Sequence, residues 1–292
     1  QAIFPFETAP CGRCARSLEL HRQVSVIIPC YNDGQYLLEA VESVKCHEDE
    51  QFYEIIIVND GSTDPFTLEV FDKCKAKGCR LIHQKNAGVA AARNTGIRVA
   101  KGKYVLPLDS DNKLLPEYMN SGFQIMEKDA KVAVVYGNPI FFGDELRTWK
   151  VKAFDMDSLF ISNYIDNCAV IRKSALEEIN GYDEDREIMG WADWDLWMRL
   201  AARGWKFHYI NAFLFHYRLR KDSMINKYSK EEMDAMRKYL FSKPEYHLIR
   251  LYREKVIELK RYNHSLTFLT RQFFSVLWEK INRKLAFQQS IF

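Results

Sequence analysis

Short apolar runs alternate with amphipathic segments along the first half of the chain. Two apolar runs rich in β-branched residues, Val24–Pro29 and Glu54–Val58, have the pattern of strands buried in a parallel sheet. Tyr104–Leu108 is predicted to be a third buried strand and Arg80–Gln84 a short strand. Helical patterns accompany them, around Leu37, Val41 and Val44, from the Asp60–Asp64 turn to Lys77, at Val89–Ala100 and from Pro116 to Lys128. This order predicts an α/β fold with a mostly parallel sheet, flanked by helices, and a ligand site at the carboxyl ends of the strands.

The pattern is less regular in the second half. A strand is predicted at Val132–Tyr136, and residues 137–164 then show no clear period, as in irregular substrate-binding lobes. An amphipathic helix at Asp193–Arg203 and a strand at Phe207–Tyr217 follow.

We divide the chain into three parts: an irregular lead at 1–22, an α/β domain at 23–226 with halves at 23–112 and 113–226, and a basic extension at 227–292. The extension is predicted to be helical beyond Ser229, with a break at Pro244. It has fourteen Lys and Arg against seven Asp and Glu, a charge of +7 in a chain of net charge +3. That small overall charge gives no reason to expect a nucleic-acid partner.

Cysteine usage and hydropathy indicate the compartment. Seven cysteines without paired spacing favour a reducing environment, and Cys11 and Cys14 form a lone C-x-x-C without the further ligands of a zinc site. Residues 1–21 lack the pattern of a signal peptide, and no apolar run reaches the roughly 18 residues of a spanning helix. We therefore predict a cytoplasmic location.

The segment Leu106–Asn112 gives the clearest chemical signal. Asp109 and Asp111 directly follow the apolar run Tyr104–Leu108, so both carboxylates are predicted at the carboxyl end of a buried strand. Two crowded acids repel each other unless a cation neutralises them, and oxygen ligands favour Mg²⁺ or Mn²⁺. A lone D-x-D is also common in solvated turns, so the surrounding sequence must distinguish a metal site from a turn.

Six segments extend this signal: Val26–Asn32 (VIIPCYN), Val58–Asp64 (VNDGSTD), Asn86–Gly96 (NAGVAAARNTG), Leu108–Asp111 (LDSD), Gly190–Leu200 (GWADWDLWMRL) and His216–Arg218 (HYR). In their order and spacing they resemble the family-2 glycosyltransferases of the GT-A fold, over about residues 24–226. The resemblance implies a GT-A (Rossmann-like) domain that transfers a sugar from a nucleotide-diphosphate donor, most often a UDP-sugar, with inversion at the anomeric carbon.

The resemblance also implies a donor site. Positions matching the turn from Pro29 to Tyr31 and matching Asp60 line the uracil pocket in the family, so Tyr31 is expected to stack on the base. Asp33 and Asp60 are expected to accept hydrogen bonds from the base or the ribose. The same motifs carry over the remaining donor-binding residues: Gly88 at a tight turn, Arg93 beside the acids or phosphates, Asp109 and Ser110.

Simpler roles for three of these residues stay open. Tyr31 would then be a partly buried loop aromatic, Asp60 a turn or capping residue, and Arg93 an exposed helix side chain. Asp64 matches a helix N-cap better than a ligand.

The resemblance implies metal ligands as well. Asp111 would bind Mn²⁺ or Mg²⁺ directly, and Asp109 would hold the ribose or reach the ion through water. His216 matches a position that completes the metal shell in this fold, although a histidine between two aromatics is equally well a hydrogen-bonded core residue.

Asp193 is the expected catalytic base, which takes the proton of the acceptor hydroxyl. The family usually has an acid before this aspartate, where this chain has Ala192, and Asp195 is the fallback base. Trp191 and Trp194 are candidates for a sugar-stacking wall on the acceptor side, or for core packing.

The predicted activity is therefore sugar transfer to a glycan or lipid-linked glycan, in bacterial surface polysaccharide synthesis. An inactive donor-binding scaffold and a sugar nucleotidyltransferase are the alternatives. In the extension an apolar stripe lies beside basic residues and consists of Phe273, Phe274, Leu277, Ile281 and Leu285. The stripe fits contact with the inner face of the cell membrane, or packing on the domain or on a partner.

Overall fold

The structure, a computed structural model, describes the following residues: 22–47, 49–221, 223, 228–246, 250–251, 254–255, 257–259 and 261. The C-x-x-C of the lead and the apolar stripe of the extension lie outside these residues.

The first half builds the parallel part of the sheet. Its strands are β1 (Val24–Cys30), β2 (Tyr53–Asn59), β3 (Arg80–His83) and β4 (Tyr104–Pro107), in the order β3-β2-β1-β4 with all neighbours parallel. The intervening helices are α1 (Gly34–Lys45), α2 (Pro65–Ala76) and α3 (Val89–Val99). The α/β prediction is confirmed, and so is Asp64 as the N-cap of α2, because its side chain accepts a hydrogen bond from the Thr67 amide.

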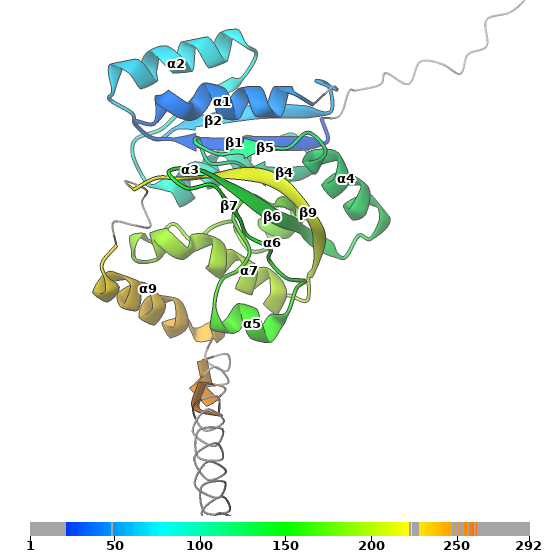
Figure 1. Cartoon of the computed structure of the whole chain (residues 1–292), viewed down its shortest axis with the longest axis vertical. Coiled ribbons are helices and arrows are strands. Elements are labelled where there is room, and N and C mark those ends of the chain that lie inside the picture. The colour runs from blue at the N-terminus through cyan, green and yellow to red at the C-terminus, as the bar shows by residue number, and fades with distance from the viewer. Residues whose placement is uncertain are drawn as a thin grey trace, which may run out of the picture. The chain divides into compact units, whose positions relative to one another are not determined.

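Helices cover both faces of these strands (Figure 1). Alternate residues of β1, such as Val26 and Ile28, pack with α1 and α2 in one continuous apolar core. Ile27 points to the other face, where a Cβ on Gly96 of α3 would lie only 2.4 Å from its side chain. The continuous apolar runs of β1 and β2 are therefore explained by burial on two sides.

The second half is mixed rather than parallel. It contains β5 (Lys113–Leu114), α4 (Tyr118–Lys128), β6 (Val132–Gly143), β7 (Arg147–Thr148), α5 (Met156–Ile161), β8 (Val170–Arg172), α6 (Lys173–Glu178), a 3₁₀ turn η1 (Arg186–Trp191), α7 (Ala192–Ala202) and β9 (Lys206–Leu219). Beyond β4 the sheet continues β8-β6-β9-β5, with β7 paired to β6. Of these neighbours only β6 and β9 run parallel.

The prediction of an irregular segment at 137–164 was wrong at its start. β6 continues to Gly143, but its pairing with β9 shifts register between Val132 and Val134 and twice more around Asn138. The first and the last of these shifts place one extra residue in one of the two strands, and each exchanges the faces of the side chains relative to the partner strand. A simple period-two pattern is therefore lost from the sequence while the strand persists.

The chain forms two compact units: unit 1 contains residues 22–159 and 163–228 among those described, and unit 2 contains Phe160–Ser162 and the residues from Ser229 onward. Unit 2 includes α9 (Lys230–Ser242), which begins at a capping box of Ser229 and Glu232, and a 3₁₀ turn η2 (Pro244–Tyr246). The predicted break at Pro244 is therefore confirmed. No helix among the described residues is both long and apolar enough to cross a bilayer.

Candidate active site

The loops after β1, β2 and β4 meet at one edge of the sheet. Cys30 pairs with Asn59 and Ile27 pairs with Pro107, so the segments that begin at Tyr31, Asp60 and Leu108 leave the sheet side by side. The structure thus brings together the strand-end positions that were expected to hold the donor.

Asp60 is the hydrogen-bonding centre of this edge. Its side chain accepts hydrogen bonds from the Gln84 amide group (2.7 Å) and from the backbone N–H groups of Ala87 and Gly88 (both 2.9 Å). The residue is buried, and Gly88 has a φ of +97° that favours glycine. Asp60 therefore shapes the loop between β3 and α3.

The β1 loop leaves one ring open. Tyr31 is 53% exposed, whereas Pro29 is buried inside β1. Asn32 follows Tyr31 in this loop, and its side chain accepts hydrogen bonds from the backbone N–H groups of Thr63 and Asp64 at 2.8 and 2.9 Å. These two bonds hold the β1 and β2 loops together next to Tyr31 in the chain.

Arg93 of α3 is a buried cation at the same edge. Its guanidinium donates to Asp109 at 2.6 Å and lies 5.5 Å from the centre of the Tyr182 ring. The simpler interpretation of Arg93 as a solvated surface residue is wrong, because only 7% of it is exposed.

Four half-buried carboxylates interact here: Asp109, Asp111, Asp166 and Asp193. Burial raises the pKa of Asp111 to about 7, with the charge of Asp109 adding to the rise. Burial likewise raises the pKa of Asp166 to about 7, and the charges of Asp109 and Asp193 contribute. The cluster holds more negative charge than its neighbouring arginines neutralise, so it favours the approach of a cation.

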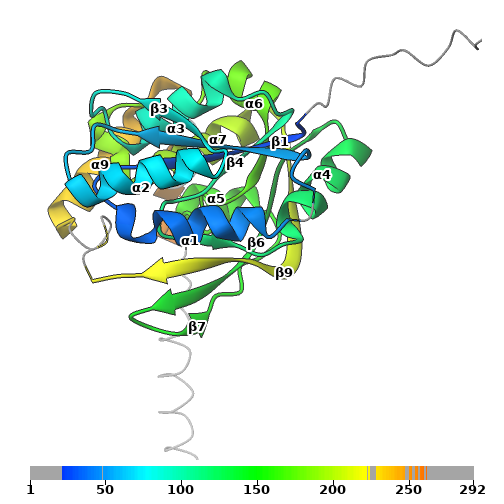
Figure 2. The same cartoon turned by 90° about the horizontal axis from the view of Figure 1, so that it is seen from above.

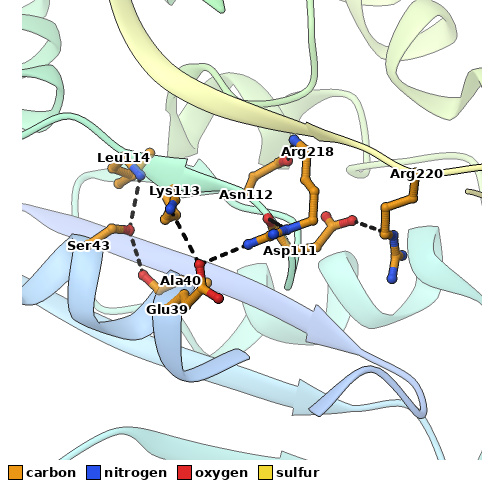
Figure 3. A network of polar contacts seen from close by, with 9 residues as sticks. All are labelled: Glu39, Ala40, Ser43, Asp111, Asn112, Lys113, Leu114, Arg218 and Arg220. Carbon is orange, nitrogen blue, oxygen red and sulfur yellow. Dashed lines mark hydrogen bonds and ion pairs between the residues drawn. The ribbon is translucent and has the colours of Figure 1, made fainter. Parts of the chain in front are cut away.

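Arg220 supplies part of the neutralising charge (Figure 3). Its guanidinium lies 2.8 Å from a carboxylate oxygen of Asp33 and 3.0 Å from one of Asp111. Ser110 also donates to Asp33, at 2.9 Å. Arg220 could not be predicted from the sequence, because it lies 187 residues from Asp33 and outside every motif.

Arg218 fixes the backbone around Asp111 and Asn112 (Figure 3). Its Nε donates to the Asp111 carbonyl at 3.0 Å, and its own backbone N–H donates to the Asn112 side chain at 2.9 Å. The same guanidinium pairs with Glu39 of α1 at 2.9 Å. Arg218 therefore holds the segment after β4 against both α1 and β9.

The structure does not group His216 with the acids. His216 pairs with Lys113 across β9 and β5, and its ring lies 5.7 Å from that of Phe142. Burial and the positive charge of Lys113 lower its pKa. The described residues contain no cluster of three or more His, Cys, Asp or Glu side chains arranged to hold a metal.

Asp193 lies in the first turn of α7. Its carboxylate accepts hydrogen bonds from the Asn163 side chain at 3.0 Å and from the Trp194 backbone N–H at 2.7 Å. Burial raises its pKa to about 6, opposed by the charge of Arg93. Asp195, in contrast, is fully buried and pairs with Arg199 at 2.7 Å, which gives it a structural role.

Of the two tryptophans expected on the acceptor side, Trp194 belongs to the core. It is 3% exposed, and its indole N–H donates to the Leu159 carbonyl at 2.6 Å. No sugar can stack on a ring so enclosed. Trp191 is half-buried and meets Trp194 edge to face at 5.4 Å.

Asn94 connects α3 to the turn that precedes η1 and α7. It donates to the Tyr182 carbonyl and accepts from the Tyr182 backbone N–H, both at 2.8 Å. Gly181 makes room for this contact, with a φ of +70° and with space so limited that a Cβ would lie 2.3 Å from the Asn94 oxygen. This contact fixes the spacing between the helix of Arg93 and the helix of Asp193.

We expect Gly181→Ala to lower the free energy of unfolding by clearly more than Gly78→Ala. Gly78 also has a positive φ, of +87°, but nothing lies within 4 Å of its missing Cβ. Both variants incur about 1–2 kcal/mol of left-handed backbone strain, and only Gly181→Ala also displaces Asn94, which adds about 1–3 kcal/mol. Urea denaturation of both proteins measures the difference, and equal losses would contradict the argument.

A family model described as Glycosyl transferase family 2 matches residues 25–180, more than half of the 292-residue chain. The chain belongs to this family. Among its relatives is a chondroitin synthase of Escherichia coli, 28% identical over 273 residues, which cover 90% of this chain but only 37% of that one.

Solved structures share the fold. Staphylococcus aureus TarS (residues 1–349, with UDP-GlcNAc) superposes with a TM-score of 0.58 at 16% identity, over 74% of this chain and 64% of that one. The mannosyltransferase PcManGT of Pyrobaculum calidifontis, with GDP-Man and Mn²⁺, gives 0.54 at 17% identity, over 69% and 58%. This family-2 glycosyltransferase therefore has the GT-A fold expected from its sequence.

Proposed function

We propose that this glycosyltransferase uses a divalent metal to move a hexosyl or N-acetylhexosaminyl group from a UDP-sugar to a hydroxyl of a glycan or lipid-linked glycan, with inversion. The observation that supports this most is the meeting of the strand-end acid Asp109 with Asp193 around the buried Arg93, with Asp111 beside Asp109. Bacterial surface polysaccharide synthesis at the cytoplasmic face of the membrane is the proposed setting, and a chondroitin synthase among the relatives fits it.

The donor half of the site is proposed to lie over residues 23–112. The exposed Tyr31 ring offers a stacking surface for the base, beside the loop that Asp60 and Gly88 shape. Asp33 and Ser110, which share a hydrogen bond of 2.9 Å, are proposed to contact the ribose. Arg93 holds Asp109 in position through their ion pair at 2.6 Å.

Asp109 and Asp111 are suited to hold Mn²⁺ or Mg²⁺. They offer carboxylate oxygens in a cluster with excess negative charge, which is the chemistry that these ions prefer. A bound ion would neutralise the diphosphate and the charge that develops on it as the sugar leaves. We keep His216 as a proposed additional ligand, although its ring packs on Phe142 in this structure. PcManGT, which shares the fold, was solved with Mn²⁺.

Asp193 is proposed to act as the general base. Asn163 donates to one of its oxygens and fixes the orientation of the carboxylate. As the acceptor oxygen attacks the anomeric carbon opposite the leaving diphosphate, its proton passes to Asp193. Because Trp194 is buried, Trp191 is the only one of the two tryptophans that we still propose as an acceptor contact. We propose that residues 113–226 form the acceptor half of the site.

Release of UDP tests the proposal. The purified protein, Mn²⁺ and a panel of UDP- and GDP-sugars are incubated with an acceptor library, and the nucleotide product is measured. We expect turnover with at least one UDP-sugar and none after EDTA. Donor binding without turnover on any acceptor would favour the inactive scaffold, for which Ala192 is the sequence argument.

We expect Arg220→Gln to tighten Mn²⁺ binding in the absence of donor by about tenfold, or about 1.4 kcal/mol. Arg220 already neutralises Asp33 and Asp111, so a cation that binds Asp111 competes with it. Electron paramagnetic resonance titration of free Mn²⁺ measures the affinity. Arg203→Gln, which removes an exposed arginine paired with Glu178, is the charge-matched control, and equal affinities in both variants would contradict the competition.

A further inference from the structure

The edge of the sheet formed by β9, β6 and β7 presents a row of aromatic side chains. Phe141 of β6 is the register partner of both Tyr217 in β9 and Arg147 in β7. Trp149 follows β7 and pairs through its backbone N–H with the Pro139 carbonyl at 3.3 Å. These side chains share one face of the ribbon, whose free end lies apart from the helices of unit 1 in Figure 2.

The rings contact one another in sequence. Phe141 and Trp149 stack with centres 6.2 Å apart and planes 11° from parallel, and Tyr217 meets Phe141 edge to face at 5.5 Å. The Arg147 guanidinium lies 4.2 Å from the centre of the Phe141 ring. Phe141 is only 7% exposed, but Trp149 is 36% exposed, so the row ends in an indole that solvent reaches.

The opposite face of the same strands is occupied. Phe142 lies between the charged ends of Lys113 and Arg218, at 4.4 and 4.3 Å from its ring centre. Arg218 in turn contacts Tyr36 of α1 at 4.1 Å. That face therefore packs on the domain, whereas the face of Trp149 stays accessible.

The row begins at the candidate active site. Arg218 follows Tyr217 in β9 and contacts the segment of the strand-end acids. Its Nε donates to the Asp111 carbonyl at 3.0 Å, and its backbone N–H donates to the Asn112 side chain at 2.9 Å. The surface from Tyr217 to Trp149 is thus continuous with the place where the acceptor hydroxyl must react.

We infer that Tyr217, Phe141 and Trp149, with Arg147 beside them, form a subsite for the acceptor's carbohydrate chain, in which a sugar behind the reacting one stacks on Trp149. This inference rests on the proposed transferase activity. One face of a pyranose ring exposes C–H groups that pack on an indole, while its hydroxyls at the rim need donors of the kind that Arg147 offers.

A bilayer is the other occupant to consider, because Leu146 at the hairpin tip is 82% exposed. Asp144 and Glu145 precede it directly, and carboxylates next to the tip oppose insertion into an anionic membrane. At its other end the row of rings leads to the segment of Asp111, through Tyr217 and its neighbour Arg218. A glycan fits both observations better.

The test compares Trp149→Ala with Phe66→Ala in the full chain. Phe66 is an exposed aromatic of α2, 51% exposed, and serves as the matched control. Acceptors of increasing length are used: a monosaccharide glycoside and the matching di-, tri- and tetrasaccharides. We expect Trp149→Ala to raise KM for the longer acceptors about tenfold, and to leave kcat, donor KM and the monosaccharide unaffected. Trp149→Phe should restore part of the affinity.

Saturation-transfer NMR with the same oligosaccharides, in the presence of UDP and Mn²⁺, separates this inference from the proposed activity. Loss of oligosaccharide contact in Trp149→Ala alone supports the subsite even if no donor is turned over. Equal KM values for all acceptor lengths, or no oligosaccharide contact in the unmodified protein, would overturn it. So would a variant that binds oligosaccharides normally but no longer sediments with vesicles of phosphatidylglycerol.

Discussion

Replacing Asp193 with Asn is expected to lower kcat by about 10²–10⁴-fold, the usual contribution of a general base. The amide has nearly the same shape and keeps an oxygen for the Trp194 backbone N–H, but it cannot take the acceptor proton. Donor affinity should stay within about threefold, because the hydrogen bonds of Asp193 go to Asn163 and to the Trp194 backbone rather than to the donor loops. UDP release measures the rate, and calorimetric titration with the UDP-sugar measures the affinity.

The neighbouring Asp195→Asn is the control on the same helix. Asp195 is fully buried in its pair with Arg199, so this variant should unfold at lower temperature. The folded fraction should nevertheless turn over at nearly the normal rate. The reverse pattern, with Asp195→Asn inactive and Asp193→Asn active, would assign the base to Asp195.

The raised pKa of Asp193 predicts how the activity depends on pH. Its burial raises its pKa to about 6, so the carboxylate is protonated and unable to accept a proton below that pH. For the free enzyme, kcat/KM should therefore decline as the pH falls through about 6, well above the ordinary aspartate value of about 3.9. The residual activity of Asp193→Asn should lack this decline.

Replacing Asp111 with Asn should remove the metal-dependent part of UDP binding, with a loss of affinity of at least about 100-fold. Removing even an outer-shell partner of a ligand typically weakens a metal site 10–100-fold, and Asp111 is proposed to bind the ion directly. Titration with UDP in the presence and absence of Mn²⁺ checks this. In the unmodified protein Mn²⁺ should strengthen binding, and in the variant it should have no effect.

Asp72→Asn provides the control for this second experiment. Asp72 is an exposed residue of α2, so the variant makes the same chemical change away from the sheet edge. It should retain metal-dependent UDP binding. If Asp111→Asn retained it too, the proposed metal site between the strand-end acids would be wrong.

The sequence predicted the parts of this site that depend on local order. In a parallel sheet the loops that follow the strands all lie at one edge. The positions of Tyr31, Asp60 and Asp109 at this edge therefore followed from the apolar runs alone. The motif order predicted the family, which the comparison confirmed. The cap at Asp64 and the break at Pro244 followed from backbone chemistry that acts within a few residues.

Contacts between residues far apart in the chain could not be predicted from the sequence. Asp166 lies outside every motif and every predicted helix or strand, so the sequence did not predict that it would join Asp109 and Asp193. Trp191 and Trp194 look equally suited to stack on a sugar, yet packing encloses Trp194 and leaves Trp191 half-exposed. Their difference depends on Leu159, whose carbonyl holds the Trp194 indole from 35 residues away.

The amino-acid sequence by itself determined the α/β order, the strand-end acids and the family of this glycosyltransferase, because each is encoded by spacing within one element or one loop. Only the tertiary structure decided which charges meet: Arg220 with Asp33 and Asp111, and Arg93 with Asp109. It also decided which face of the β9-β6-β7 ribbon stays open. Register shifts in β6 set that face, and they depend on pairing with a strand some seventy residues later.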